Sequence, residues 1–186
     1  MSDSKSNPWT TKKSETIYEN PWIHVVKNDV INPNGGDGEY TVVHFRNRAV
    51  SAVPIDEHGY TWLVGQYRYT MDSFEWEVPE GGGPMNEEAL ESAKRELQEE
   101  TGLIANRWDM LFSDVQLSNS VTDELAYGFV ARDLTQCEAA PDETELLQVK
   151  RLPFEEAIEM IYRNEIRDGF SILSLLQAQH LLRSER

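Results

Sequence analysis

The stretch from Gly81 to Leu103, GGGPMNEEALESAKRELQEETGL, places six glutamates and a single arginine between two glycine positions. Glu96, Glu99 and Glu100 are spaced at i, i+3 and i+4, so on a helix their side chains share one face. Three crowded carboxylates repel one another unless a hard divalent cation, which prefers oxygen ligands, lies among them. The spacing therefore predicts a site for Mg²⁺, with Mn²⁺ as an alternative.

A helix over residues 87–101 is needed to position these carboxylates. Asn86 is a candidate N-cap, and Gly102 can provide a left-handed C-terminal cap. The planar guanidinium of Arg95 can hold neighbouring carboxylates in a fixed orientation. The opposite face carries an apolar stripe that predicts burial against a sheet. Its members are Ala89, Leu90, Ala93 and Leu97.

A charged run of this kind is in most proteins a solvated helix face, and three glutamates alone favour that interpretation. The complete pattern favours a different one. The segment resembles the Nudix box at every fixed position. It consists of Gly81, five residues, Glu87, seven residues and then RELQEETGL from Arg95 to Leu103. The resemblance implies an α+β fold, the Nudix α/β/α sandwich with a mixed sheet, here with extra N-terminal antiparallel strands. It also implies that Glu100 and Arg95 belong to the catalytic group.

The remaining chain fits that architecture. Residues 1–16 are polar and expected to be flexible, residues 17–186 to form a single domain, and residues 17–46 to form an N-terminal β subdomain. A glycine turn is expected at Gly81. The expected strands lie within residues 17–31, 40–45, 49–55, 60–67, 74–78, 108–115, 124–131 and 146–152, followed by a helix from Pro153 and another, capped by Asp168 or Ser171, through Leu182.

Segments outside the box narrow the resemblance. Gly65-Gln66-Tyr67-Arg68 and Trp76-Glu77-Val78-Pro79-Glu80-Gly81 look like the pre-box signature of Nudix enzymes that cleave ADP-ribose and nucleoside diphosphate sugars. In that subgroup the extra strands exchange between two subunits, so the resemblance implies a homodimer. Leu117-Ser118-Asn119-Ser120 stands where the ADP-ribose subgroup tends to have a proline. GDP-mannose and similar substrates therefore stay open.

Several residues are candidates for substrate contacts or metal binding. Arg68 can clamp a phosphate or pair with Glu77, and Trp22 and Tyr67 can stack on a base or sugar or simply pack. Glu80 departs from the small residue that is common before the box glycine, but its backbone carbonyl can still join Glu96, Glu99 and Glu100 around the metal.

A general base is the remaining requirement of such a site. The resemblance implies a glutamate from a late loop, here residues 141–145. Glu145 fits best and Glu143 second, with an ordinary exposed acidic loop as the alternative.

These features together indicate a Mg²⁺-dependent hydrolase that cleaves a nucleoside diphosphate sugar into a nucleoside monophosphate and a sugar phosphate. One alternative is a catalytically silent Nudix module that senses such ligands. Another is a Nudix pyrophosphatase acting on coenzyme A, a dinucleoside polyphosphate or capped RNA.

Length, net charge and cysteine content limit the class of protein to which this chain can belong. A chain of 186 residues is long enough to bury a core, and its net charge of −16 argues against a nucleic-acid partner. The single cysteine, Cys137, cannot form an internal disulfide, which favours a reducing cytoplasm. Since no segment has the pattern of a signal peptide or a membrane span, we expect a soluble protein without a membrane partner.

Overall fold

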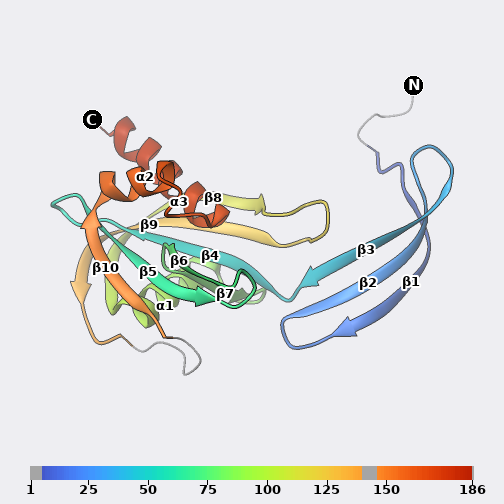
Figure 1. Cartoon of the computed structure of the whole chain (residues 1–186), viewed down its shortest axis with the longest axis horizontal. Coiled ribbons are helices and arrows are strands. Elements are labelled where there is room, and N and C mark those ends of the chain that lie inside the picture. Colours follow the sequence, from blue (N-terminus) through green and yellow to red (C-terminus); the bar gives the residue numbers. More distant parts are fainter. Residues whose placement is uncertain (1–5, 140–145, 186) are drawn as a thin grey trace. The chain divides into compact units, whose positions relative to one another are not determined.

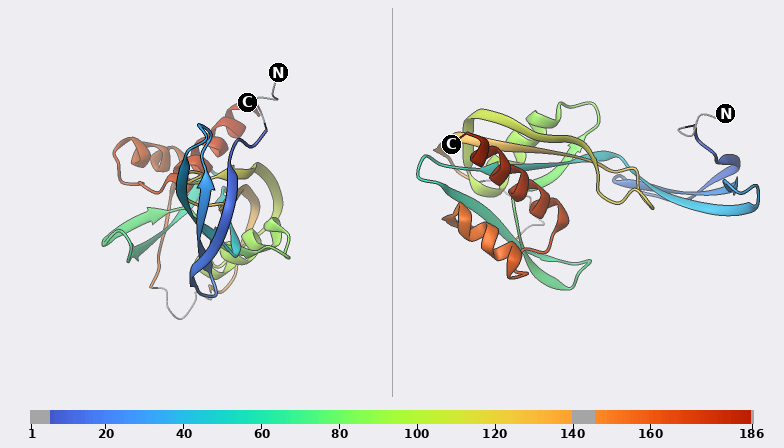
Figure 2. Two further views of the ribbon diagram at one scale, coloured as in Figure 1. Left: turned by 90° about the vertical axis from the view of Figure 1, so that its right-hand side faces the viewer. Right: turned by 90° about the horizontal axis from the view of Figure 1, so that it is seen from above.

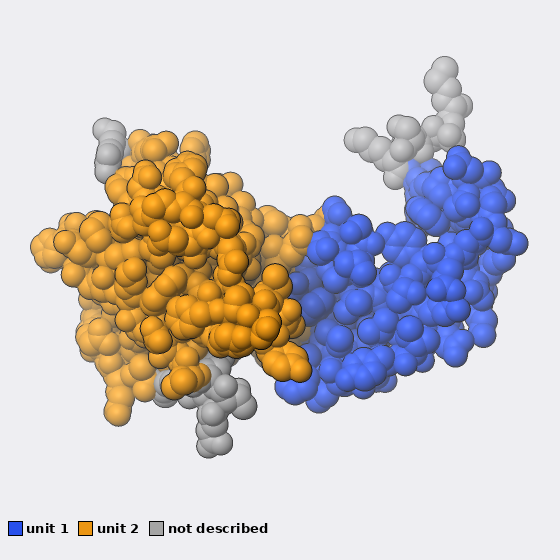
Figure 3. All heavy atoms as spheres, viewed as in Figure 1, with its two compact units in different colours: residues 1–46, 118–124 blue, residues 47–117, 125–186 orange. Residues whose placement is uncertain are grey.

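The computed structural model describes residues 6–139 and 146–185, which fall into two compact units (Figure 3). Unit 1 takes its residues from 1–46 and 118–124, and unit 2 takes the others. No helix within the described residues is long and apolar enough to cross a membrane.

Unit 1 is an antiparallel sheet whose three strands follow one another in the order β1-β2-β3 (Figures 1 and 2). The turn before β3 includes Gly35, whose φ of 84° favours glycine. The first strand begins at Thr10, so the expectation of a flexible segment is wrong for residues 10–16, which are hydrogen-bonded to the next strand. The strands are β1 (Thr10–Glu19), β2 (Ile23–Ile31) and β3 (Asp37–Phe45).

The segment of residues 118–124 belongs to unit 1 because it is bonded to β3. The hydroxyl of Tyr40 donates to the carbonyl of Ser120 at 2.8 Å. The Nδ1 atom of His44 lies 2.6 Å from a carboxylate oxygen of Asp123. A short piece of the later chain is therefore part of the N-terminal sheet unit.

Unit 2 contains two further sheets, one of four strands and one of three. The four-stranded sheet has the order β7-β4-β9-β8 and is mixed, because β4 and β9 run parallel while their outer neighbours are antiparallel. The other has the order β10-β5-β6. The strands are β4 (Asn47–Pro54), β5 (Tyr60–Arg68), β6 (Ser73–Glu77), β7 (Glu80–Pro84), β8 (Leu103–Gln116), β9 (Leu125–Gln136) and β10 (Gln148–Pro153).

Three helices cover the sheets of unit 2 (Figures 1 and 2). Alternation along β4 places its side chains on opposite faces: Val50 packs with Ala93 of α1, whereas the hydroxyl of Ser51 bonds that of Ser174 in α3 at 2.8 Å. The four-stranded sheet therefore lies between helices, and the expected α/β/α sandwich is confirmed. The helices are α1 (Ala89–Thr101), α2 (Phe154–Tyr162) and α3 (Gly169–Ser184).

The ends of α1 were only partly predictable. Gly102 has the left-handed conformation, with φ of 68°, and its N–H bonds the carbonyl of Gln98, as the expected cap requires. The start is different: the helix begins at Ala89 with Glu88 as its N-cap, so the prediction of Asn86 is wrong. Beside the first turn, the hydroxyl of Ser92 bonds the Glu87 carboxylate at 2.6 Å.

Candidate active site

The three glycines after Glu80 form a strand and not the expected turn. They belong to β7, which pairs with β4, and α1 lies directly against them. A Cβ atom on Gly81 would meet the carboxyl carbon of Glu96 at 2.3 Å, and one on Gly83 would meet the hydroxyl of Ser92 at 2.5 Å. The fully buried Ser92 cannot easily move, so Gly83 has no room for a side chain, whereas a side chain at Gly81 would displace the flexible Glu96 carboxylate.

Arg95 connects the acidic face of α1 to β7. Its guanidinium lies 2.8 Å from a Glu96 oxygen and 2.8 Å from a Glu99 oxygen, and it donates to the carbonyl of Gly82 at 2.9 Å. Burial acts to lower the pKa of Arg95, but the charges of Glu96 and Glu99 raise it by more. The net shift of the pKa is upward, so the guanidinium stays charged. One cation thus orients two of the three helix carboxylates that are predicted to bind the metal.

Glu100 faces the beginning of β7. The residue is buried, and one carboxylate oxygen accepts a hydrogen bond of 3.0 Å from the backbone N–H of Glu80. Of the three glutamates, Glu99 is the most exposed, with 40% of its side chain accessible against 13% for Glu96. The helix therefore presents Glu96 and Glu100 toward the strand and Glu99 toward solvent.

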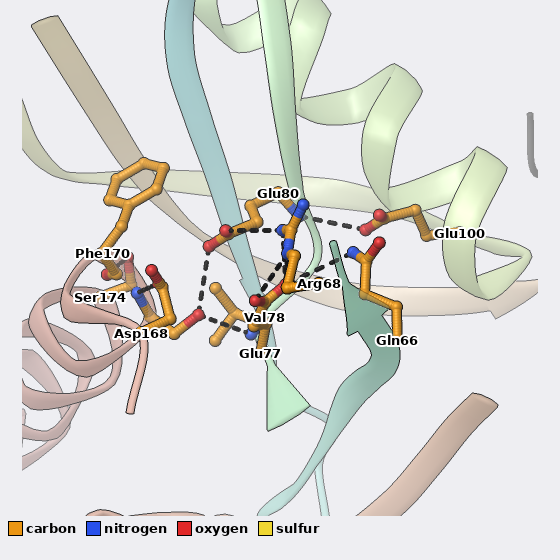
Figure 4. Close-up of polar contacts among 10 residues, drawn as sticks. Gln66, Arg68, Glu77, Val78, Glu80, Glu100, Asp168, Phe170 and Ser174 are labelled. Carbon is orange, nitrogen blue, oxygen red and sulfur yellow. Dashed lines mark hydrogen bonds and ion pairs between the residues drawn. The ribbon is translucent and has the colours of Figure 1, made fainter. Parts of the chain in front are cut away.

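A second acidic cluster lies between the strands of unit 2 (Figure 4). Arg68 forms a bidentate pair with Glu77, with distances of 2.8 and 2.5 Å, and also reaches a carboxylate oxygen of Glu80 at 3.3 Å. Burial lowers the pKa of Arg68, but both carboxylates raise it, and the net shift is upward. Of the two expectations for Arg68, the structure contains the pairing with Glu77, and the phosphate contact stays a prediction.

The Glu80 side chain points toward α3 and away from α1 (Figure 4). Its second carboxylate oxygen accepts a hydrogen bond of 3.1 Å from the hydroxyl of Ser171. Burial raises the pKa of Glu80 well above its usual value, and the nearby charges of Asp168 and Glu77 add to this effect. The side chain thus belongs to a buried network that the sequence did not reveal.

Asp168 caps α3, which settles one open alternative. Its carboxylate accepts a hydrogen bond of 2.6 Å from the backbone N–H of Ser171, the interaction expected of an N-cap. Ser171 is instead the third helical residue, so its hydroxyl is available to the Glu80 side chain. The Asp-x-x-Ser spacing indicates the cap but gives no signal for the contact with Glu80.

Comparison with known families supports the sequence resemblance. The family described as NUDIX domain matches residues 45–171. The chain belongs to the Nudix family. A second family, described as nucleoside diphosphate sugar hydrolase N-terminal domain, matches residues 9–43. The expectation of a Nudix pyrophosphohydrolase is therefore confirmed.

Individual proteins match the chain over most of its length. The chain is 29% identical to a methanol dehydrogenase activator of Bacillus methanolicus, over 93% of this chain and 95% of that protein. It is 32% identical to an ADP-ribose pyrophosphatase of Mycobacterium tuberculosis (89% and 81%) and 29% identical to a GDP-mannose pyrophosphatase of Yersinia enterocolitica (90% and 93%). A solved structure titled as an ADP compounds hydrolase superposes with a TM-score of 0.87 at 25% identity, over 98% of both chains.

Nudix hydrolases generally use divalent metal ions, and the donors present here suit one. Carboxylate and carbonyl oxygens are the ligands that Mg²⁺ and Mn²⁺ prefer. In the described part of the chain, no three His, Cys, Asp or Glu side chains already lie together as a metal-binding group, since Glu96 and Glu99 are directed at Arg95. The donor chemistry fits, and the assignment of these ligands remains a prediction.

The other predicted site residues are Trp22, Tyr67, Glu143 and Glu145. Trp22 lies in unit 1 and Tyr67 in unit 2, and both side chains are largely exposed. The Tyr67 hydroxyl donates to a carboxylate oxygen of Asp72 at 2.6 Å. The two candidates for the general base, Glu143 and Glu145, lie outside the described residues. The roles of all four residues remain predictions.

Proposed function

We propose that this Nudix protein is a Mg²⁺-dependent hydrolase that cleaves the diphosphate of a nucleoside diphosphate sugar, releasing a nucleoside monophosphate and a sugar phosphate. The packing of α1 on the glycines of β7 carries this proposal. It sets Glu96 and Glu100 against the strand and fixes Arg95 between the helix and the Gly82 carbonyl. That arrangement places two of the proposed carboxylate ligands beside the backbone of β7 on a rigid support.

The chemistry follows from charge. A diphosphate resists attack because its oxygens repel an incoming nucleophile, and a divalent ion neutralises that charge and lowers the pKa of a bound water. Glu96, Glu99, Glu100 and the Glu80 carbonyl would hold the ion. Arg95 keeps two of these carboxylates oriented before substrate arrives. Glu145, or else Glu143, would accept the proton of the attacking water.

ADP-ribose is the substrate that we place first. An ADP-ribose pyrophosphatase matches at 32% identity over 89% of this chain, and the solved structure is named for ADP compounds. GDP-mannose stays a candidate because Leu117-Ser118-Asn119-Ser120 departs from the ADP-ribose pattern. Tyr67 and Trp22 would stack on the base or sugar, and Arg68, held by Glu77, would contact a phosphate.

We also propose a cytoplasmic homodimer formed through the N-terminal strands. In the described residues of unit 1 only Val30 is buried, and Trp9, Ile17, Tyr18 and Trp22 are exposed. A three-stranded sheet needs an apolar face packed on something to be stable. Light scattering on the full chain should give about twice the chain mass of 21.4 kDa. A monomer mass would contradict the dimer and leave the hydrolase unaffected.

The test of the activity is turnover of ADP-ribose, GDP-mannose, UDP-glucose, coenzyme A and a nucleoside triphosphate, each with Mg²⁺, with Mn²⁺ and with a chelator. We expect metal-dependent release of a nucleoside monophosphate and a sugar phosphate, identified by mass spectrometry. Preference for the triphosphate or for coenzyme A would overturn the substrate class. Equal turnover with the chelator would overturn the metal.

A Glu100→Gln variant separates the enzyme from a silent ligand-sensing module. We expect the variant to lose turnover by about 10²-fold or more while remaining folded. Glu91→Gln is the matched control, because Glu91 lies on the same helix and its carboxylate pairs with Lys94 at 2.7 Å, away from β7. If the wild type binds these compounds and hydrolyses none of them, the sensing alternative is correct.

A further inference from the structure

A series of hydrogen bonds connects the N-terminus of α3 to Glu100 on α1. The hydroxyl of Ser171, a fully buried residue, accepts from the backbone N–H of Val78 at 3.0 Å and donates to the Glu80 carboxylate at 3.1 Å. The backbone N–H of Glu80 in turn donates to Glu100 at 3.0 Å (Figure 4). One hydroxyl therefore bonds the backbone of Val78 and the side chain of Glu80, the residue whose N–H bonds Glu100.

Other bonds leave this short segment little freedom. The carbonyl of Pro79 accepts from the backbone N–H of Ala52 at 2.9 Å. The Glu80 side chain is held on its other oxygen by Arg68 at 3.3 Å. Asp168 fixes the Ser171 backbone through the helix cap. Each of these partners is buried or makes a further hydrogen bond. We therefore expect that removing the Ser171 hydroxyl displaces the Glu80 backbone, because water cannot replace the lost hydrogen bonds.

We propose that Ser171 is a positioning residue for the divalent ion: its hydroxyl fixes the backbone of Glu80 and, through the Glu80 N–H, the orientation of the Glu100 carboxylate. This inference rests on the proposed function, because it requires that the carboxylates of α1 bind a metal. Groups that orient metal ligands without touching the ion commonly change metal affinity about 10- to 100-fold when they are removed.

The test measures Mn²⁺ binding to the full-length protein without substrate, by electron paramagnetic resonance or calorimetry. We expect Ser171→Ala to raise the Mn²⁺ dissociation constant by about tenfold. Ser174→Ala is the matched control: Ser174 is equally buried, lies one turn later in α3, and bonds Phe170 and Ser51. Its removal should leave Mn²⁺ affinity unchanged while costing comparable stability toward urea.

A second variant keeps the inference testable if Ser171→Ala does not fold. Glu80→Ala removes the side chain that Ser171 bonds but keeps the backbone carbonyl and N–H, and it should also weaken Mn²⁺ binding. In the double variant the effect on Mn²⁺ affinity should not exceed the larger single effect, because both changes break the same link.

The outcomes separate the two proposals. Normal Mn²⁺ binding in Ser171→Ala, or an equal loss in Ser174→Ala, overturns the positioning role and leaves the proposed function standing. A wild-type protein that binds no Mn²⁺ without substrate overturns this inference, and one that also binds none with ADP-ribose present overturns the metal-dependent function.

Discussion

Two acidic clusters in unit 2 differ in what balances their charge. The strand cluster, Glu77 and Glu80, is buried and bonded to Arg68 and to the Ser171 hydroxyl. The helix cluster, Glu96, Glu99 and Glu100, shares the half-exposed Arg95 and the Glu80 N–H. Carboxylates satisfied inside the protein support the fold, whereas three carboxylates beside one cation can accept a divalent ion. The strand cluster is therefore held by protein partners, and the helix cluster is the one that we propose for metal binding.

The largest effect is expected where the helix cluster meets β7. Gly81→Ala places a Cβ at 2.3 Å from the Glu96 carboxyl carbon, so the carboxylate must move, and a displacement of this size lowers kcat by about 10²-fold. The measurement is the steady-state kinetics of ADP-ribose hydrolysis. Gly82→Ala is the control, since its Cβ would meet the amide end of the Asn47 side chain at 3.0 Å. Wild-type kcat in Gly81→Ala would contradict the close packing.

Removing the cation of the strand cluster should mainly reduce stability. Arg68→Ala leaves the buried Glu77 carboxylate unpaired, and we expect a loss of about 2–3 kcal/mol in the free energy of unfolding. The estimate lies below that for a fully buried pair because 37% of the Arg68 side chain is exposed. Arg163→Ala, which breaks exposed pairs with Glu156 and Glu165, should lower the stability much less in the same urea titration. Equal losses would show that burial does not distinguish these pairs.

Glu80→Gln tests the charge within the strand cluster. Because burial, Asp168 and Glu77 raise the pKa of Glu80, the unfolded chain loses this proton at lower pH than the folded chain does. Ionisation therefore destabilises the folded state as pH rises above the ordinary value of 4.5. With a chelator present, Glu80→Gln should gain stability relative to wild type as pH rises from 4.5 toward neutrality. A gain that shrinks with rising pH would contradict the raised pKa.

Asp56 has a lowered pKa, so its effect on stability has the opposite dependence on pH, and we expect this effect to be smaller. Burial acts to raise the pKa of Asp56, but hydrogen bonds from Arg151 and from the N–H groups of Tyr60 and His58 outweigh it, and the pKa is lowered. Its contribution to stability is present above the ordinary value of 3.8 and is lost as pH falls through the folded pKa. Asp56→Asn should cost about 1 kcal/mol at neutral pH. The difference from wild type in thermal unfolding should narrow below pH 3.8, and a constant difference would refute this sign.

Much of the helix cluster was predictable from local spacing. The apolar stripe and the Gly102 cap depend on residues within a few turns of one another, and they predicted α1 to within two residues at its start and correctly at its end. Helical periodicity predicted one shared face for Glu96, Glu99 and Glu100, whereas the structure turns Glu96 and Glu100 toward β7 and leaves Glu99 more exposed. Arg95 holds two of these carboxylates, as its position suggested.

Within the strand cluster, the pairing of Arg68 with Glu77 was one of two expectations, but the link from Glu80 to Ser171 was missed because the two residues are distant in sequence. The glycines of β7 suggested a turn, and only the packing of α1 shows that they are needed in a strand. Ser171 lies 91 residues from Glu80, so no local pattern links them. The start of β1 at Thr10 is likewise fixed by pairing with β2, which overrides the polar composition of residues 10–16.

The most direct test of this account is calorimetric titration of Mg²⁺ and Mn²⁺ into the wild type and into a variant with Gln at positions 96, 99 and 100. We predict that the wild type binds the ions, and that the triple variant loses binding and turnover but unfolds at no lower urea concentration. Unchanged metal binding in the triple variant, or hydrolysis by a wild type that binds no metal, would contradict the assignment of the helix cluster as the metal site.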